Sequence, residues 1–190
     1  MTAAWTIRRA TVADAAMVAE LAARTFEETF ATQNRPEDME AHRARTYGEA
    51  LQRREIEDPN GVTLLIEQVV EQEGEAIGYA QLRRGHSPAC FPCDAPVEIG
   101  RFYVAREWHG RGVAQALMSA VRAAARTLGG TVLWLGVWER NPRAIAFYAK
   151  CGFRDVGSQP YIVGSDVQTD RVMVQDINFP DMDRRPPPTA

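Results

Sequence analysis

The sequence has few cysteines and no long apolar segment. Three cysteines occur among 190 residues, and an odd number in a chain without a secretory signal argues against a disulfide framework. No apolar run approaches the roughly 20 residues that span a bilayer. The N-terminal segment also lacks the basic and apolar regions of a signal peptide. We therefore predict a cytoplasmic protein without a membrane partner.

An excess of charge of one sign is also lacking. The chain has 22 basic and 25 acidic residues, a formal net charge of −3, whereas nucleic-acid-binding domains usually carry a basic surface. We therefore predict no nucleic-acid partner. With 45% hydrophobic and 25% charged residues, the composition is that of a globular domain with its own core. We predict one domain over residues 1–178 and expect the proline-rich end, 179–190, to be disordered.

Two of the cysteines, Cys90 and Cys93, form a CxxC pair in a proline-rich loop. With His86 as a third ligand, they could form part of a zinc site, or they could be a redox pair. A structural zinc site needs four ligands, and a second cysteine pair is missing. The strand-to-helix setting of a thioredoxin-like motif is missing too. We therefore favour two incidental thiols and predict no metal site.

Hydrophobic periodicity predicts helices and strands in mixed order. Helices are expected at 11–30, 36–44, 49–57, 112–128 and 141–150. Strands are expected at 6–9, 62–70, 76–83, 97–104, 131–138, 153–156 and 171–177. Thr11 and Asp14 form a capping-box pattern for the first helix. A meander of strands followed by alternating strands and helices predicts a mixed α/β sheet.

A glycine-containing turn, His109 to Ala114, lies between a predicted strand and a predicted helix. Glycine lets a backbone approach a ligand closely, and the free amides at a helix start favour phosphate. The pattern is neither a Walker A loop nor the GxGxxG fingerprint of dinucleotide-binding proteins. On local composition alone, a helix start that binds nothing is an open alternative.

The stretch from Val97 to Phe153 resembles the two central motifs of the GNAT acetyltransferases. The first motif, Gln/Arg-x-x-Gly-x-Gly/Ala, wraps the pyrophosphate of coenzyme A in that family. Gly112 and Ala114 match its small positions, whereas His109 departs from the usual first residue. The segment Asn141–Phe153 resembles the second motif, a capped helix with a tyrosine before a Gly-Phe turn. The two motifs cover about a third of the chain and occur in the family's order.

This resemblance implies the GNAT fold, a twisted and largely antiparallel sheet with a splayed central strand pair and helices on both faces. It also implies acetyl-CoA as cosubstrate, with its pantetheine arm along strand 97–104 and the N–H of Phe102 near the thioester oxygen. The cofactor-binding residues that it implies are Phe102, Tyr103, Val104, His109, Gly110, Arg111, Gly112, Val113, Ala114 and Asn141.

Amine acetylation needs a base and an acid. An alkyl amine with a pKa of ~10.4 arrives protonated and must lose a proton before it attacks. Glu98 lies where histone-acetylating members of the family carry a catalytic glutamate, although it could instead face solvent or pair with Arg101 or another arginine. Glu139 is the second candidate. Tyr148, at the tyrosine position of the second motif, is the predicted acid for the leaving thiolate, and its alternative is a core tyrosine.

The sequence shows no serine or cysteine nucleophile with a paired histidine, so direct transfer is favoured over an acyl-enzyme. The acceptor is predicted from acidic residues that could attract a polycation, although they could also be solvated helix ends. They are Glu27, Glu28, Glu37, Asp38 and Glu40.

Together with the segment 134–141, the acidic stretch resembles PaiA-like polyamine acetyltransferases. We therefore predict a small di- or polyamine acceptor. A peptide α-amine, as in the acetyltransferases of ribosomal proteins, is the alternative within the enzyme class. A non-catalytic acyl-CoA-binding regulator is the alternative outside it, and such a protein would not need Glu98 or Tyr148. A homodimer is a further expectation.

Overall fold

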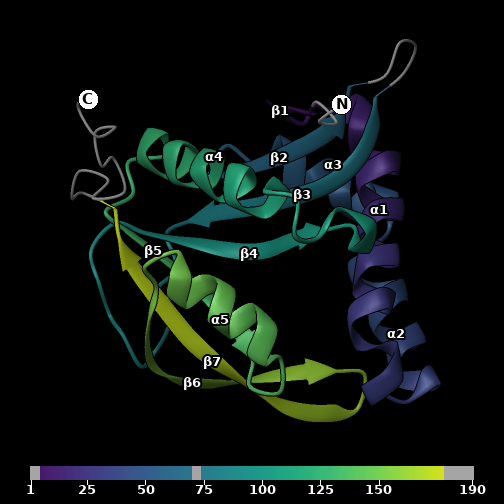
Figure 1. Ribbon diagram of the computed structural model, residues 1–190. Coiled ribbons are helices and arrows are strands. Elements are labelled where there is room, and N and C mark those ends of the chain that lie inside the picture. The colour runs from purple at the N-terminus through teal and green to yellow at the C-terminus, as the bar shows by residue number, and fades with distance from the viewer. Residues whose placement is uncertain (1–4, 70–73, 178–190) are drawn as a thin grey trace, which may run out of the picture.

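Figure 1 shows a computed structural model of the chain, which describes residues 5–69 and 74–177. Its centre is a seven-stranded sheet in the order β1-β2-β3-β4-β5-β7-β6. The strands are β1 (Trp5–Arg9), β2 (Gly61–Gln68), β3 (Glu75–Arg84), β4 (Pro96–Val104), β5 (Val132–Trp138), β6 (Arg154–Val163) and β7 (Asp166–Asp176). Neighbours are antiparallel except β4 and β5, which run parallel. The predicted mixed and largely antiparallel sheet is confirmed.

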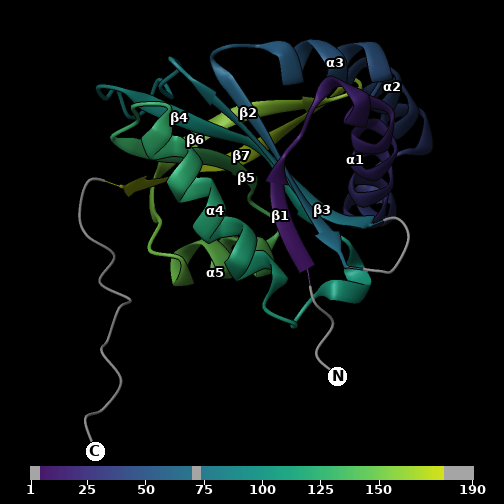
Figure 2. The ribbon, with the colours of Figure 1, turned by 90° about the horizontal axis from the view of Figure 1, so that it is seen from above.

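Helices cover both faces of this sheet, as predicted. They are α1 (Ala15–Phe30), α2 (Pro36–Thr46), α3 (Glu49–Glu57), α4 (Val113–Thr127) and α5 (Pro142–Lys150), with short 3₁₀ turns at Val12–Asp14, Ala31–Gln33 and Arg106–Trp108. Figure 2 shows α1 to α3 on one side and α4 and α5 on the other. Alternate residues of a strand point to opposite faces. Thus Leu64 and Ile66 of β2 join the core under α4, while Leu65 joins the core under α1.

The two parallel strands in the middle of the sheet diverge. Pro96–Glu98 of β4 pairs with Val132–Trp134 of β5, and the pairing ends there. β4 nevertheless continues to Val104 and β5 to Trp138, so their carboxyl-terminal halves separate (Figure 1). The predicted splay is confirmed, and it leaves one edge of each strand without a strand partner.

The last two strands differ from the prediction. They form a long hairpin, β6 and β7, that turns at Gly164 and Ser165, whereas the sequence predicted two short strands at 153–156 and 171–177. The segment between them lacks alternating apolar residues and contains Gly157 and Pro160. Proline is tolerated because β6 is the edge strand, where a missing N–H breaks no ladder. Pairing along β7, rather than apolar patterning, therefore forms this strand.

The capping box at Thr11 and Asp14 is present and opens the 3₁₀ turn that leads into α1. Arg8 of β1 holds the turn, because its Nη2 lies 2.8 Å from Asp14 Oδ1 and 2.6 Å from Glu67 Oε1. The Arg8 guanidinium lowers the pKa of Asp14. This ion-pair network fixes the start of α1 relative to the first two strands.

Several expectations concern features outside this core. The predicted tail, 179–190, lies outside the described residues. Within the described ranges, no helix is long and apolar enough to cross a bilayer. In the same ranges, no group of three or more His, Cys, Asp or Glu residues is placed to hold a metal ion. Cys90 and Cys93 carry free thiols, the first exposed and the second half-buried.

Candidate active site

A cleft of about 620 Å³ opens where β4 and β5 diverge. We call it the large cleft. Its walls come from the end of β4, the glycine turn before α4, the first half of α5 and the last turns of α1. Gly110 and Ala114 line it from the first motif, and Ala144 and Tyr148 line it from the second. The fold therefore brings the two sequence motifs to one site.

The glycine turn has the backbone that the sequence suggested. Gly110 and Gly112 have φ angles of +76° and +85°, in the left-handed region that favours glycine. Gly112 is the N-cap of α4, and no described side chain caps the helix, so the first-turn amides have no protein acceptor. A Cβ on Gly110 would meet nothing within 4 Å, so the turn faces open space. Free amides at the positive end of a 15-residue helix suit a phosphate group.

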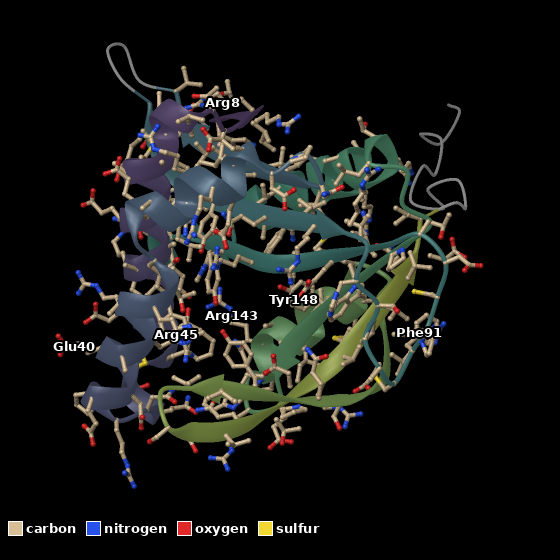
Figure 3. All side chains as sticks on the ribbon, turned by 180° about the vertical axis from the view of Figure 1, so that it is seen from behind. Arg8, Glu40, Arg45, Phe91, Arg143 and Tyr148 are labelled. Atoms are coloured by element: carbon tan, nitrogen blue, oxygen red, sulfur yellow. The ribbon has the colours of Figure 1, made fainter. Side chains whose placement is uncertain are left out.

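Three exposed arginines that the sequence analysis did not single out also line the large cleft: Arg106, Arg140 and Arg143. Arg106 lies in the 3₁₀ turn after β4, and the other two flank the Asn-Pro cap of α5 (Arg143 is labelled in Figure 3). Arginine pairs well with phosphate oxygens. For Arg140 and Arg143, the proximity to the Asn-Pro cap of the second motif was the available signal. The large cleft thus combines free amides with cationic side chains.

The predicted cofactor-binding residues divide into two groups. Those that line the large cleft are Phe102, Tyr103, Val104, His109, Gly110, Ala114 and Asn141, whereas Arg111, Gly112 and Val113 do not. The guanidinium carbon of Arg111 lies instead 5.3 Å from the ring centre of Trp108.

Two of the lining side chains also hold the protein backbone. His109 Nε2 lies 2.8 Å from the carbonyl oxygen of Val104 and ties the glycine turn to the end of β4. Asn141 Oδ1 accepts a hydrogen bond from the amide of Ala144 at 3.1 Å. The predicted cap of α5 is therefore present. Both residues position the two motifs relative to the cleft.

Tyr148 lies between the core and the cleft. It is 8% exposed, and its ring makes edge contacts with Phe102 and Phe153 at 6.1 and 5.7 Å between centroids. Figure 3 shows it extending from α5 into the region between β4 and the hairpin. Burial raises the pKa of its phenol, so Tyr148 keeps its proton at neutral pH. Tyr148 therefore belongs to the core, as the alternative interpretation held, and also lines the cleft; its role as the acid stays a prediction.

A second cavity of about 210 Å³, the inner chamber, continues from the large cleft, since Phe102, Trp138 and Tyr148 line both. The hairpin closes its other end. Aromatic rings form much of its wall, from Phe26, Phe30, Phe102, Tyr103, Trp138, Tyr148 and Tyr161. Two carboxylates, Glu98 and Asp170, also line it. The sequence analysis missed Tyr161 of β6 and Asp170 of β7, because both lie in the polar stretch between the two strands that the sequence predicted at 153–156 and 171–177.

Of the two candidate bases, Glu98 faces the inner chamber and Glu139 does not. Glu98 Oε2 accepts a hydrogen bond from Arg83 Nη2 at 2.6 Å, and Arg83 lies opposite it on β3. The alternative of an ion pair therefore holds with Arg83 and not with Arg101, which pairs with Glu55 at 2.6 Å. Glu139 is exposed and lines neither cavity.

The acidic stretch of the first helices does not gather at the cleft. Glu28 lines it, but Glu40 points away from the sheet (Figure 3). Asp38 is buried, and its Oδ1 accepts hydrogen bonds from the amide and hydroxyl of Ser165 at 2.7 and 2.9 Å. These bonds lower the pKa of Asp38. Asp38 thus anchors the hairpin turn. Of the five acidic residues, only Glu28 lines the large cleft, because the side chains of the others lie on other faces of their helices.

Residues 16–153 match the acetyltransferase (GNAT) family. The chain therefore belongs to this family: it is an N-acetyltransferase, and acetyl-CoA is its cosubstrate. An uncharacterised N-acetyltransferase of Mycobacterium tuberculosis is 34% identical over 164 residues, which cover 86% of this chain and 98% of that protein.

Solved structures share the fold. The PaiA N-acetyltransferase of Thermoplasma acidophilum in complex with coenzyme A superposes with a TM-score of 0.70 at 19% identity, covering 91% of this chain and 99% of that one. A spermidine N-acetyltransferase SpeG chimera from Vibrio cholerae and hSSAT gives a TM-score of 0.65 at 19% identity, covering 91% and 95%. At these identities, the likeness concerns the fold.

Proposed function

We propose that the protein transfers an acetyl group from acetyl-CoA directly to a primary amine that enters the inner chamber. One observation carries this proposal: the glycine turn, the diverging strands and Tyr148 all open onto the large cleft. The amides of residues 110–114 would hold the pyrophosphate, with Arg106, Arg140 and Arg143 beside them. Acetyl-CoA supplies the activated acetyl thioester.

The free edge of β4 suits the pantetheine arm of the cosubstrate. Beyond Glu98, β4 has no strand partner on the side of β5, although it still pairs with β3 on its other side. An extended, amide-containing ligand can bind such an edge as an added strand. Phe102, Tyr103 and Val104 would provide this edge, and the Phe102 N–H is the candidate donor to the thioester oxygen.

Two side chains take the proton-transfer roles in this proposal. Glu98 is the candidate base, because it lines the chamber in which the amine must lose its proton. Tyr148 is the candidate acid, since burial keeps its phenol protonated and it lines both cavities. Among the described residues, no serine or cysteine lines either cavity. Direct transfer therefore fits this lining better than an acyl-enzyme.

For the acceptor, we favour a small di- or polyamine. Aromatic faces and carboxylates together attract alkylammonium groups, and the inner chamber offers both. Glu28 adds a carboxylate at the large cleft. A regulator that only binds acyl-CoA would need neither this chamber nor a buried tyrosine at its entrance, which favours an enzyme.

The experiment mixes the full-length protein with acetyl-CoA and putrescine, spermidine or a peptide with a free N-terminus, and follows release of free thiol. We expect thiol release with the polyamines at lower concentration than with the peptide. Acetylation of the peptide alone would replace the polyamine proposal with the peptide one. No heat and no thermal shift with acetyl-CoA would refute the donor site itself.

A pair of variants separates a base from an ion-pair partner. Glu98→Gln removes the base and the ion pair, whereas Arg83→Met removes only the ion pair. Arg83 is 61% exposed in its side chain, so losing it should have little effect on folding. We expect turnover to fall in the first variant alone, by the ~10²–10⁴-fold typical of a positioned base. Equal turnover in the two variants would exclude Glu98 as the base.

A further inference from the structure

Asp170 is a buried carboxylate without a partner. It lies on β7 between β5 and β6, opposite Trp138 and Gln159, and is 7% exposed. No hydrogen bond or ion pair reaches its carboxylate from any residue in the described ranges. An unpaired buried charge is costly, so its retention at the wall of a cavity suggests a ligand.

The fold makes room for this carboxylate. A Cβ built on Gly136 of β5 would lie 2.8 Å from Asp170 Oδ2 and 3.1 Å from Gln159 Nε2. Glycine at this position therefore lets both polar groups lie against the β5 backbone, inside the chamber wall. Any other residue at 136 would displace them. The site is thus built by three neighbouring strands, β5, β6 and β7.

The surroundings of Asp170 favour a cation. Burial raises the pKa of its carboxyl to about 6, so the group is ionised at neutral pH. The other titratable groups that line the chamber are Glu98, Arg101 and Tyr103 from β4, Tyr148 from α5 and Tyr161 from β6. Arg101 is already bound by Glu55 and Gln81 and so does not neutralise Asp170.

Aromatic rings complete the site. Trp138 lies opposite Asp170 in the β5–β7 register, and Tyr161 follows Gln159 on β6 at 38% exposure. Faces of tryptophan and tyrosine attract ammonium groups. A carboxylate at the end of an aromatic-lined cavity is the chemistry that recognises a primary alkylammonium, and it would repel an anionic ligand.

We infer that Asp170 binds, in the inner chamber, the ammonium group of a di- or polyamine acceptor that does not itself react, and so determines that this enzyme takes cationic alkylamines. The inference rests on the proposed function and adds an acceptor-binding residue to it. Asp170 lies beyond residues 16–153, the part that matches the family. Asp170 acts in binding, so its loss should raise KM for the acceptor. Glu98 and Tyr148 act in transfer, so their loss should lower kcat.

The test compares Asp170→Asn with wild type in steady-state acetylation of putrescine at pH 8. The substitution keeps the shape and removes the charge. We expect KM for putrescine to rise about 10- to 100-fold, the value of a charge-assisted hydrogen bond, while KM for acetyl-CoA stays unchanged. Asp155→Asn is the matched control, since it removes an equal charge from β6 at an exposed carboxylate that pairs with Arg171.

Binding without turnover gives a second readout. Putrescine should raise the melting temperature of wild type and of Asp155→Asn, but not of Asp170→Asn. If wild type acetylates amines and Asp170→Asn keeps the same KM and the same thermal protection, the inference is wrong while the proposed function stands. If wild type acetylates no amine, the proposed function fails, and protection by putrescine that Asp170→Asn loses would still support the ammonium site.

Discussion

The glycine turn at the large cleft and the inner chamber that continues from this cleft are built in different ways. The turn consists of consecutive residues whose backbone conformation, φ of +76° and +85° at two glycines, creates the site. The chamber has walls from α1, β4, β5, α5 and the β6–β7 hairpin. Backbone geometry dominates the first region, and the meeting of distant side chains dominates the second.

Their charges differ in the same way. The turn has free amides and arginines around it, which suit an anion. The chamber has carboxylates and aromatic faces, which suit a cation. An anionic donor and a cationic acceptor would therefore be drawn to opposite ends of one continuous space. The difference suggests that variants of one region should leave binding at the other intact.

The largest effect is expected from Gly112→Val. A β-branched residue is strained at φ +85°, and the turn must rearrange its amides to relieve this strain. We expect no measurable heat with acetyl-CoA in calorimetry and hence no turnover. Gly129→Val is the control, because Gly129 has a φ of +78° but follows the other end of α4. Intact binding in the Gly112 variant would show that the turn does not hold the cosubstrate.

Tyr148→Phe should affect transfer without affecting binding of the donor. Loss of a positioned acid lowers turnover by ~10²–10⁴-fold, whereas the phenyl ring keeps its packing against Phe102 and Phe153. Tyr79→Phe is the matched control, since Tyr79 is a fully buried tyrosine that lines neither cavity. The measurement is kcat together with calorimetric affinity for acetyl-CoA. Wild-type turnover in the Tyr148 variant would show that Tyr148 only packs in the core and is not the acid.

Asp170→Asn should stabilise the fold at high pH. The folded pKa, about 6, exceeds the ordinary 3.8, so the folded state binds this proton more tightly than the unfolded state does. The ionised carboxylate therefore destabilises the protein fully above about pH 6, and this cost disappears as pH falls toward 4. Removing the charge should add ~1–3 kcal/mol at pH 8.

Urea unfolding at pH 8 and pH 5 measures this difference. Asp155→Asn should show no gain, since pairing with Arg171 lowers the pKa of Asp155 and its loss removes a stabilising contact. An unchanged stability of Asp170→Asn at pH 8 would mean that the carboxylate is solvated in the fold. The inner chamber would then lack the unpaired buried carboxylate on which its proposed preference for a cation depends.

The smallest effect is expected at the cleft entrance. Glu28→Gln should raise KM for spermidine a few-fold at low salt and not at physiological ionic strength, where screening acts over ~8 Å. Glu37→Gln should change nothing, because Glu37 lines neither cavity. A peptide with one charge should show a flatter salt response than spermidine. Equal effects of the two glutamate variants would indicate that only net charge matters.

Most of the donor side could be predicted from the sequence because its signals are local. The glycine turn, the Asn141 cap and the tyrosine of α5 each depend on a few residues along the chain. The structure shows the left-handed glycines and the Asn141 cap, while the roles of these residues toward the cosubstrate stay predictions. The hairpin could not be predicted, because β6 is held by pairing with β7 and not by its own apolar pattern. Asp170 was missed for the same reason, since a lone aspartate in a polar stretch carries no signal until its strand is formed.

The sequence by itself thus determined the mixed sheet and the turn at the start of α4 through periodicity and local residues, and the family and the splayed strand pair through the resemblance that its motifs carry. The tertiary structure decided which charges face the acceptor. It turned Glu40 to solvent, gave Asp38 to Ser165 and left Glu28 at the cleft. It also buried Asp170 against Gly136. Burial and pairing of a charge depend on the residues that packing brings beside it, and neighbours in sequence do not fix them.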